Sequence, residues 1–330
     1  MKIDGKAIAS EIKQNLRQHI LSLKSRNIIP HLAVILIGDD PSSLAYVRQK
    51  QKVGEEIGAQ VTIRRLSPQI KLDQFVQLTK SLNASGNIHG IIIQRPIPIN
   101  ISNKQLNSLV APKKDIDGFH PNSLFTPPIA LAVLKIMEWI RIDAKPKIPI
   151  LETELPSKTS DSTLLLSEKF GIEDLQKFEN LIHWLKGKKI LIIGRGVTGG
   201  KPIANTFRKM NIPFQIAHSK TSEKDLTNLC QQSNIIISCV GKPNVIRGDF
   251  FKQKTQTLNH LAIQPFNHSY FLIGVGLHQE DNILKPDYDQ DKVGESVAFY
   301  TPVPGGVGPV NVACLFENLI KAVLLSSSRK

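Results

Sequence analysis

Tyr46 and Lys50, two residues with chemically useful side chains, stand four positions apart in the segment SLAYVRQK. In a helix this spacing puts both side chains on one face. A lysine amine can hold or move a proton when its surroundings tune its pKa, and a phenol can align a ring. Taken alone, such a pair is more often a feature of an exposed helix surface, so its meaning depends on neighbouring segments.

Three further polar residues stand where ligands are often bound. Gln94 ends the apolar run HGIIIQ and is followed by two prolines. A polar side chain at the carboxyl end of a strand points toward the crevice where α/β proteins bind ligands. Asp115 and Asp117 stand beside Gly118, and without more context they are ordinary turn residues.

A glycine-rich loop carries the clearest mechanistic signal. Within KKILIIGRGVTGGKP (188–202), the pattern Gly194-x-Gly196-x-x-Gly199 follows an apolar run and opens a helical segment. Glycines allow a tight turn and close approach to a pyrophosphate, and the helix N-terminus offers N–H groups to the phosphates. The strand–turn–helix context indicates a dinucleotide site.

The residues after the next predicted strand favour NADP over NAD. NAD sites usually place an acid about 20 residues beyond the loop, against the ribose hydroxyl. Here the segment at 217–221 reads AHSKT and contains no acid. Ser219 and Lys220, together with Arg195 inside the loop, suit a 2′-phosphate, although the two cations are also typical of solvated loops.

The elements that must position these residues alternate between strands and helices. Branched apolar runs predict buried strands, and apolar residues at helical spacing predict helices. Helices are expected at 6–24, 43–58, 72–82, 130–140, 172–185, 201–210, 223–232 and 310–325, and strands at 31–38, 60–66, 89–94, 189–193, 213–217, 234–240 and 271–275. This order indicates parallel βαβ units in two α/β domains. The Pro- and Ser/Thr-rich residues 142–172 interrupt it, and we interpret them as a linker or insertion.

Composition bounds the class of protein. The chain of 330 residues is 41% hydrophobic and 21% charged, which is ordinary for globular domains. No stretch approaches the roughly 18 apolar residues of a membrane span, and the polar start lacks a signal peptide, so we expect a cytoplasmic protein. Three cysteines, Cys230, Cys239 and Cys314, show no metal-ligand spacing, so we expect buried thiols and no metal.

The net charge of +14 suggests an anionic partner. A phosphorylated cofactor and a polycarboxylate substrate would fit. We expect no nucleic-acid partner, because there is no recognised motif and only two Trp and four Tyr are present for base stacking. A basic surface without specific meaning remains an alternative.

Seven segments in a fixed order carry a family resemblance. They are DDPSSLAYVRQK (39–50), GIIIQRPIP (90–98), KDIDGFHPN (114–122), GRGVTGGKP (194–202), HSKT (218–221), SCVGKP (238–243) and TPVPGGVGP (301–309). Together they resemble the methylenetetrahydrofolate dehydrogenase/cyclohydrolase family. The resemblance covers nearly the whole chain apart from residues 142–172 and about 252–270.

The resemblance implies a fold and an activity. The fold is an α/β catalytic domain built from both chain ends, here 1–140 plus 305–330, and a Rossmann-like NADP-binding domain, here 141–304, with folate in the cleft between them. Members are usually homodimers. They oxidise 5,10-methylene-tetrahydrofolate to the 5,10-methenyl form with NADP and hydrolyse that to 10-formyl-tetrahydrofolate. A dehydrogenase-only member and a non-catalytic folate- or nucleotide-binding protein remain alternatives.

The resemblance also implies site residues. Lys50 would be the catalytic lysine of the hydrolytic step, Gln94 would orient it, and Tyr46 would stack on or align the folate. Asp117 would bind the amino-pyrimidine edge of the pterin. The folate wall would be Pro304, Gly305 and Gly306. Cofactor contacts would come from Gly194, Arg195, Gly196, Gly199, Ser219, Val240 and Gly241, with Arg195 and Ser219 holding the 2′-phosphate.

This sequence departs from the family pattern at several positions. Gly196 replaces the usual Ser and Gly199 the usual Val, which leaves cofactor preference open. Arg95 stands where Leu is usual, and it would meet the glutamate tail of folate or face solvent. Gly274 replaces the usual Asp of a strand end. None of these positions is Lys50, Gln94 or Asp117, so we expect the chemistry to survive.

Overall fold

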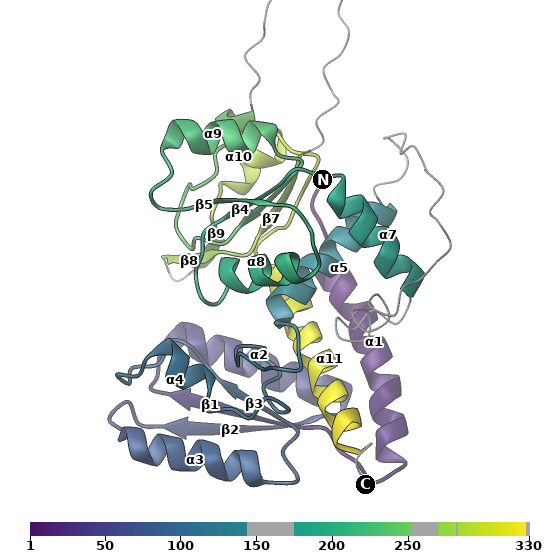
Figure 1. Cartoon of the computed structure of the whole chain (residues 1–330), viewed down its shortest axis with the longest axis vertical. Coiled ribbons are helices and arrows are strands. Elements are labelled where there is room, and N and C mark those ends of the chain that lie inside the picture. Colours follow the sequence, from purple (N-terminus) through teal and green to yellow (C-terminus); the bar gives the residue numbers. More distant parts are fainter. Residues whose placement is uncertain (144–174, 252–269, 282, 328–330) are drawn as a thin grey trace, which may run out of the picture. The chain divides into compact units, whose positions relative to one another are not determined.

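The computed structural model describes residues 1–143, 175–251, 270–281 and 283–327 (Figure 1). They form two compact units, each described here by itself. The first unit contains residues 1–8, 132–143 and 175–310 of the described chain, and the second contains residues 9–131 and 311–327. The expected insertion at 142–172 lies, after its first two residues, outside the described residues.

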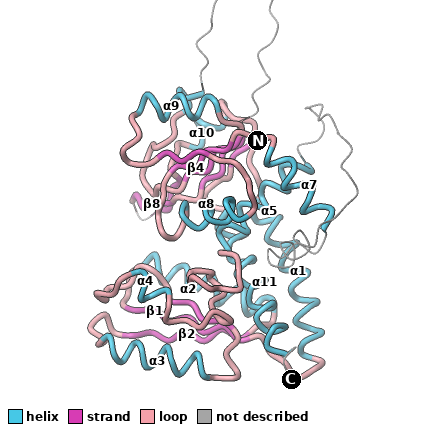
Figure 2. The backbone as a smooth tube through the Cα atoms, viewed as in Figure 1, coloured by secondary structure: helices cyan, strands magenta, loops and turns pink. Residues whose placement is uncertain are grey.

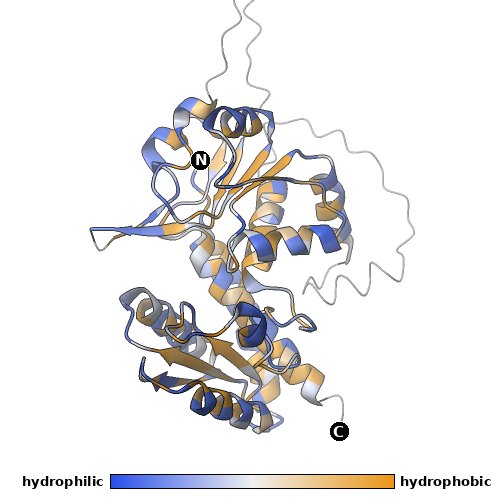
Figure 3. Cartoon of the chain, turned by 60° about the vertical axis from the view of Figure 1, so that its left-hand side comes forward, coloured by the Kyte–Doolittle hydropathy of each residue, from blue (hydrophilic) through white to orange (hydrophobic). Residues whose placement is uncertain are grey.

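The second unit is built on a three-stranded parallel sheet. Its order is β2-β1-β3, with β1 at His31–Ile37, β2 at Gln60–Leu66 and β3 at Gly90–Ile93. The central strand β1 is buried at all but its first residue, which explains its unbroken run of branched apolar side chains. The edge strand β2 has a partly exposed, polar pattern. Figure 3 shows the central strands of the parallel sheets in both units as predominantly hydrophobic.

Helix α2, Pro41–Ile57, has clear signals at both ends. The Asp40 side chain accepts a hydrogen bond from the Ser43 N–H at 2.8 Å, and Pro41 occupies the first turn. Gly58 ends the helix with φ of 86°, a left-handed conformation that favours glycine. The helix therefore begins at Pro41, two residues before the expected start at residue 43. The other helices of this unit are α3, Leu72–Ala84, the short α4, Asn103–Asn107, and most of α1, Gly5–Lys24.

The final helix, α11 at Val307–Ser327, supplies core to the second unit from the far end of the chain. Packing between α11 and α2 is close, since a Cβ at Gly54 would stand 3.2 Å from the Phe316 ring. The expectation that no segment approaches a membrane span is wrong by length and composition, because residues Val307–Ser326 reach a mean hydropathy of 1.4. However, 67% of that window is buried inside the protein, as in the core helix of a folded domain.

The first unit is built on a five-stranded parallel sheet. Its order is β10-β7-β6-β4-β5, with bounds Phe299–Tyr300, Phe271–Gly274, Ile235–Ser238, Ile190–Ile193 and Gln215–Ala217. The chain passes from β4 to β5 on one side and then to β6 on the other. The strand order therefore reverses at β4, and ligands bind beyond the carboxyl ends of strands at such a point.

Helices accompany the strands of this sheet (Figure 2). They are α5 at Pro128–Asp143, of which residues from 132 belong to this unit, α7 at Leu175–Lys186, α8 at Gly200–Lys209, α9 at Glu223–Gln232, the 3₁₀ turn η1 at Gly248–Phe251 and α10 at Gln290–Gly294. A two-stranded antiparallel ribbon joins β8, Leu277–Glu280, to β9, Ile283–Pro286. The two-domain α/β fold expected from the sequence is confirmed, and the long elements lie close to their expected ranges.

Two of the three cysteines are buried free thiols, as expected, namely Cys230 and Cys314, whereas Cys239 is partly exposed. Burial raises the pKa of Cys230 to about 12, so this thiol stays protonated and unreactive. Among the described residues, no group of three or more His, Cys, Asp or Glu side chains could hold a metal ion.

Candidate active site

Helix α2 and strand β3 bring Lys50 and Gln94 together. The Lys50 Nζ donates a hydrogen bond to Gln94 Oε1 at 2.7 Å. The Gln94 Nε2 in turn donates to the carbonyl of Arg95 at 2.9 Å, which orients the amide with its oxygen toward the lysine. Tyr46 lies one helical turn before Lys50 on α2. The structure thus joins two residues 44 positions apart that the sequence analysis selected separately.

The environment of Lys50 favours an amine that can release its proton. Burial lowers its pKa, and the Asp117 carboxylate opposes that shift. Burial raises the pKa of the Tyr46 phenol, so that side chain stays neutral. A partly desolvated lysine beside a carboxylate is suited to proton transfer.

Asp115 and Asp117 follow β3 in a compact loop. Asp115 is 3% exposed, and its carboxyl accepts a hydrogen bond from the His120 N–H at 2.7 Å. Burial raises the pKa of Asp115 to about 7. Burial also raises the pKa of Asp117, while Lys50 and Arg95 hold it down. Asp115 is therefore more than a turn residue, because its buried carboxyl organises the loop that carries Asp117.

Two polar side chains that the sequence analysis did not select clamp this loop. Lys114 is 8% exposed, and its Nζ donates to the carbonyls of Leu82 at 3.1 Å and Ser85 at 2.6 Å, at the end of α3. The fully buried Asn318 of α11 donates its Nδ2 to the carbonyls of Ile116 and Thr126, both at 2.8 Å. An asparagine inside the apolar segment VNVACLFENLI was the available sequence signal for Asn318.

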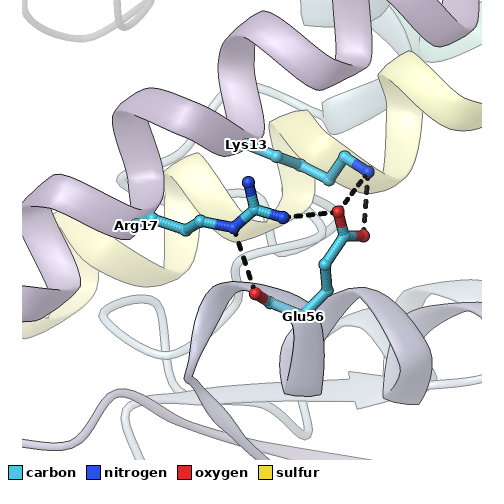
Figure 4. Close-up of polar contacts among 3 residues, drawn as sticks. All are labelled: Lys13, Arg17 and Glu56. Atoms are coloured by element: carbon cyan, nitrogen blue, oxygen red, sulfur yellow. Dashed lines mark hydrogen bonds and ion pairs between the residues drawn. The ribbon is translucent and has the colours of Figure 1, made fainter.

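The far end of α2 is held by charge. Lys13 and Arg17 of α1 both contact the Glu56 carboxylate, at 2.8 and 2.6 Å, and the Arg17 Nε donates to the Glu56 carbonyl at 3.1 Å (Figure 4). The Lys13 hydrogen bond is the main cause of a lowered Glu56 pKa. These cations lie beside the carboxyl end of α2, where positive charge also suits the helix dipole.

A pocket lies beside Asp117 in the second unit. It is lined by Ile91, Ile93, Arg95, Leu106, Asn107, Val110, Asp115, Asp117 and Phe119. Arg95 is half-buried and does not extend into solvent. Its guanidinium donates to Asn103 Oδ1 at 2.7 Å and to Asn107 Oδ1, and its Cζ lies 4.7 Å from the centroid of the Phe119 ring.

In the first unit, the loop after β4 depends on two glycines. Gly194 has φ of 99°, and a Cβ there would stand 2.8 Å from the carbonyl oxygen of Cys239. A Cβ at Gly200 would stand 2.0 Å from the Gly194 carbonyl oxygen. By contrast, a Cβ at Gly196 would meet nothing within 4 Å, and one at Gly199 would make ordinary contacts from 3.4 Å. The packing glycine is therefore Gly200, which the sequence analysis did not select, and the two family departures fall where a side chain fits.

The loop leads into α8 in the manner of an anion site. Gly199 caps α8 without a side-chain hydrogen bond, so the first turn keeps its positive dipole end for a ligand. Strands β4 and β5 pair with Ile193 opposite Ala217. Arg195 and Ser219 stand two residues beyond these partners and are exposed at neighbouring strand ends. The arrangement fits a phosphorylated dinucleotide.

A buried carboxylate organises the second loop of this unit. Asp287 is fully buried and accepts hydrogen bonds from the Ser238 hydroxyl at 2.5 Å and from the N–H groups of Val240 at 2.9 Å, Gly241 at 2.7 Å and Lys242 at 3.0 Å. The N–H groups of Val240 and Gly241 are thus committed to Asp287. Any cofactor contact at these two residues would use their other atoms. Asp287 was not among the residues selected from the sequence.

The segment before Pro304–Gly306 is anchored by Tyr288 and Gln290. The Tyr288 hydroxyl donates to the Thr301 carbonyl at 2.6 Å, and the Gln290 amide exchanges two hydrogen bonds with the Val303 backbone, at 2.8 and 3.0 Å. A Cβ at Gly274 would stand 2.5 Å from the Tyr288 oxygen. The departure at Gly274 therefore makes room for the phenol.

Comparison with known proteins identifies the family of both parts of the chain. Residues 3–117 match the model of the tetrahydrofolate dehydrogenase/cyclohydrolase catalytic domain, and residues 170–327 match its NAD(P)-binding domain. The "Bifunctional protein FolD" of Exiguobacterium sibiricum is 32% identical over 97% of this chain and 98% of its own length.

Solved structures agree. The bifunctional FolD methylenetetrahydrofolate dehydrogenase/cyclohydrolase of Campylobacter jejuni is 29% identical, with a TM-score of 0.72, covering 100% of this chain and 99% of that one. The 5,10-methylenetetrahydrofolate dehydrogenase of the silkworm Bombyx mori is 26% identical, with a TM-score of 0.76 and the same coverage. The expected enzyme class and nicotinamide cofactor are thereby confirmed, and the chain belongs to the tetrahydrofolate dehydrogenase/cyclohydrolase family.

Proposed function

We propose that this chain oxidises 5,10-methylene-tetrahydrofolate to 5,10-methenyl-tetrahydrofolate with NADP and then hydrolyses the methenyl form to 10-formyl-tetrahydrofolate. The hydrogen bond between Lys50 and Gln94, beside the Asp117 carboxylate, carries the proposal. It supplies a lysine of lowered pKa held by a neutral amide, in a chain whose other unit has a dinucleotide loop. A dehydrogenase-only member is the second possible outcome of the test below.

In the hydrolytic step, Lys50 serves as the proton carrier. Water adds to the cationic methenyl carbon and loses one proton, which leaves a neutral carbinol. The carbinol hydroxyl then loses its proton to form the formyl C=O while the bond from that carbon to N5 breaks and N5 gains a proton, so one proton is released to solvent overall. A neutral Lys50 amine can take the proton of the attacking water and deliver a proton to N5. Gln94 accepts from the ammonium and keeps it aimed, without adding a charge that would raise the lysine pKa.

Folate binding rests on Asp117, Tyr46 and the segment Pro304–Gly306. A carboxylate pairs well with the two N–H donors of an amino-pyrimidine edge. A Tyr46 kept neutral by burial can lie against the ring system. The segment Pro304–Gly306 would line the folate site without offering a polar side chain. The hydrogen bonds of Tyr288 and Gln290 hold the preceding residues in place.

A bound NADP would supply the acceptor for the hydride of the methylene carbon. Gly194 and the start of α8 would hold its pyrophosphate, with Gly196 and Gly199 completing the loop. Arg195 and Ser219, with Lys220 beside them, would hold the 2′-phosphate, because all three are exposed and the segment after β5 presents no acid. Val240 and Gly241 would line the cofactor from the loop that Asp287 organises.

The division into a folate-binding part, 1–140 plus 305–330, and an NADP-binding part, 141–304, belongs to the same proposal, as do a homodimeric state and a cytoplasmic location. Free cysteines, of which two are buried, suit a reducing compartment. Size-exclusion chromatography with light scattering tests the dimer, and a monomer at micromolar concentration would contradict it.

The test is turnover of 5,10-methylene-tetrahydrofolate with NADP and NAD in parallel, followed by the absorbance of the methenyl product. We expect reduction of NADP in preference to NAD, and enzyme-dependent decay of added methenyl-tetrahydrofolate. Oxidation without such decay would indicate the dehydrogenase-only member. Arg195→Ala and Ser219→Ala should weaken NADP much more than NAD, and equal loss for both cofactors would remove the 2′-phosphate assignment.

A further inference from the structure

Arg95 places a guanidinium in the same pocket as Asp117. Both side chains line that pocket, and both belong to the second unit. Arg95 follows Gln94 directly at the end of β3, so it is attached to the strand end that orients Lys50. Arg95 therefore stands among the residues assigned to the substrate, and the proposed function above gives it no role.

Three neighbours hold the guanidinium in a defined position. Asn103 and Asn107 on α4 accept from its two terminal nitrogens, and the Phe119 ring lies under it at 4.7 Å. These two hydrogen bonds use two of its five N–H groups. An arginine left to solvent would keep the rotamer freedom that this one has lost. The contacts of Asn103, Asn107 and Phe119 therefore fix the orientation of the Arg95 guanidinium plane.

The pocket combines acceptor and donor groups side by side. Burial lowers the pKa of Arg95, and the Asp117 and Asp115 carboxylates oppose that shift. Burial raises the pKa of Asp117, and Lys50 and Arg95 oppose that shift. The pocket therefore pairs a carboxylate acceptor with a guanidinium donor, with the apolar side chains of Ile91 and Ile93 beside them.

A pterin presents a complementary edge. Its 2-amino group and N3–H are donors, and the adjacent 4-oxo group is an acceptor. We propose that Arg95 is a specificity-determining substrate contact that donates to the 4-oxo group of the pterin while Asp117 accepts from the neighbouring N–H groups. This inference rests on the proposed function, because it requires a folate in this pocket. It gives Arg95 a ring contact in place of the glutamate-tail contact considered from the sequence.

The test compares tetrahydrofolate with 4-amino-4-deoxytetrahydrofolate, in which the 4-oxo acceptor becomes an amino group and N3 loses its hydrogen. Their dissociation constants are measured by calorimetry for the wild-type chain, Arg95→Leu and Arg95→Lys. The wild type should prefer the 4-oxo ligand by about tenfold or more, the value of a hydrogen bond to a charged group. Arg95→Leu should lose about tenfold in 4-oxo affinity and the corresponding tenfold of the preference, while the share from the N3–H contact with Asp117 remains. Arg95→Lys should fall between.

Two controls keep the result interpretable. Arg64→Leu removes an exposed arginine of β2 in the same unit, and it should change neither affinity. NADP affinity of Arg95→Leu should equal that of the wild type, which reports an intact fold in the other unit. An unchanged 4-oxo/4-amino ratio in Arg95→Leu would overturn the inference, even if both affinities fell together, because a structural role through α4 would lower both.

Failure of the proposed function is distinguishable from failure of the inference. A wild-type chain that neither binds tetrahydrofolate nor turns over its methylene form overturns both. A wild-type chain that turns over methylene-tetrahydrofolate, together with an Arg95→Leu variant of unchanged ligand preference, overturns the inference alone.

Discussion

The two candidate sites differ in whether side chains or backbone shape them. In the second unit the site consists of side chains: Lys50 bonds to Gln94, and Arg95, Asp115 and Asp117 line a pocket. In the first unit the loop after β4 is shaped by backbone, with glycines at the positions of closest approach and a buried carboxylate behind the neighbouring loop. The first kind of site depends on charge and pKa, and the second depends on the absence of side-chain atoms. Substitutions should therefore affect the two units in different ways.

The largest effect is expected at Gly200. A Cβ there would stand 2.0 Å from the Gly194 carbonyl oxygen, and both groups are backbone that cannot move aside cheaply. Gly200→Ala should destabilise the first unit by about 3 kcal/mol or more and abolish NADP binding. Urea unfolding and NADP titration measure these effects.

Gly196→Ala is the matched control in the same loop. Because nothing lies within 4 Å of the added Cβ, stability should change by no more than about 0.5 kcal/mol. Equal losses for the two variants would contradict the assignment of Gly200 as the packing glycine.

The next largest effect is expected at Gly274, where an added side chain would overlap the Tyr288 phenol. Gly274→Ala should cost about 2 kcal/mol, because its Cβ would stand 2.5 Å from the phenol oxygen. Tyr288→Val should also destabilise the chain, through lost burial and the lost bond to Thr301. The double variant should be more stable than the sum of the single changes predicts, by about 1 kcal/mol or more. Additive free energies of unfolding would show that the two positions do not compete.

These cases also show how far the sequence could go. Lys50, Gln94 and Asp117 were predictable because each sits in a short recognisable segment, and the strands were predictable because buried parallel strands are runs of branched residues. Asn318 binds residues up to 202 positions away, and Asp287 binds Ser238 at a separation of 49. No local pattern links such partners, so their roles appeared only in three dimensions.

Short elements were missed for a related reason. The strands β8 and β9 have four residues each, and the helices α4 and α10 have five. Such lengths are too short for a period of 2 or 3.6 to emerge from the sequence. Gly199 was selected because it completes the Gly-x-Gly-x-x-Gly spacing, and only packing identifies Gly200.

An effect of similar size is expected from the pH dependence of Asp115. Its folded-state pKa of about 7 lies above its ordinary value of 3.8, so the folded chain binds more protons between these values. The stability contributed by Asp115 is then full below about pH 4 and declines as the pH rises through about 7. Asp115→Asn should remove that decline, whose part between pH 5 and 7 is on the order of 2–3 kcal/mol.

Unfolding of both proteins by urea from pH 5 to 8 measures the difference. Parallel stability curves for the wild type and Asp115→Asn would mean that the carboxyl is ionised in the folded chain across this range.

The smallest effect is expected at the ion pairs that Lys13 and Arg17 form with Glu56 at the end of α2. Glu56→Gln removes the charge that Lys13 and Arg17 share, and partly exposed pairs contribute about 0–1 kcal/mol. The wild-type advantage over Glu56→Gln should shrink at 1 M salt, because screening weakens such pairs. A loss above about 2 kcal/mol, insensitive to salt, would indicate a packing role instead.

The most direct test of the central claim is the rate of methenyl-tetrahydrofolate hydrolysis by Lys50→Ala, measured beside Lys52→Ala. Lys52 lies on the same helix but is exposed, so its variant should match the wild type. Lys50→Ala should lose about 100-fold or more in hydrolysis while NADP affinity stays unchanged. Wild-type hydrolysis by Lys50→Ala, with its fold intact, would contradict the account.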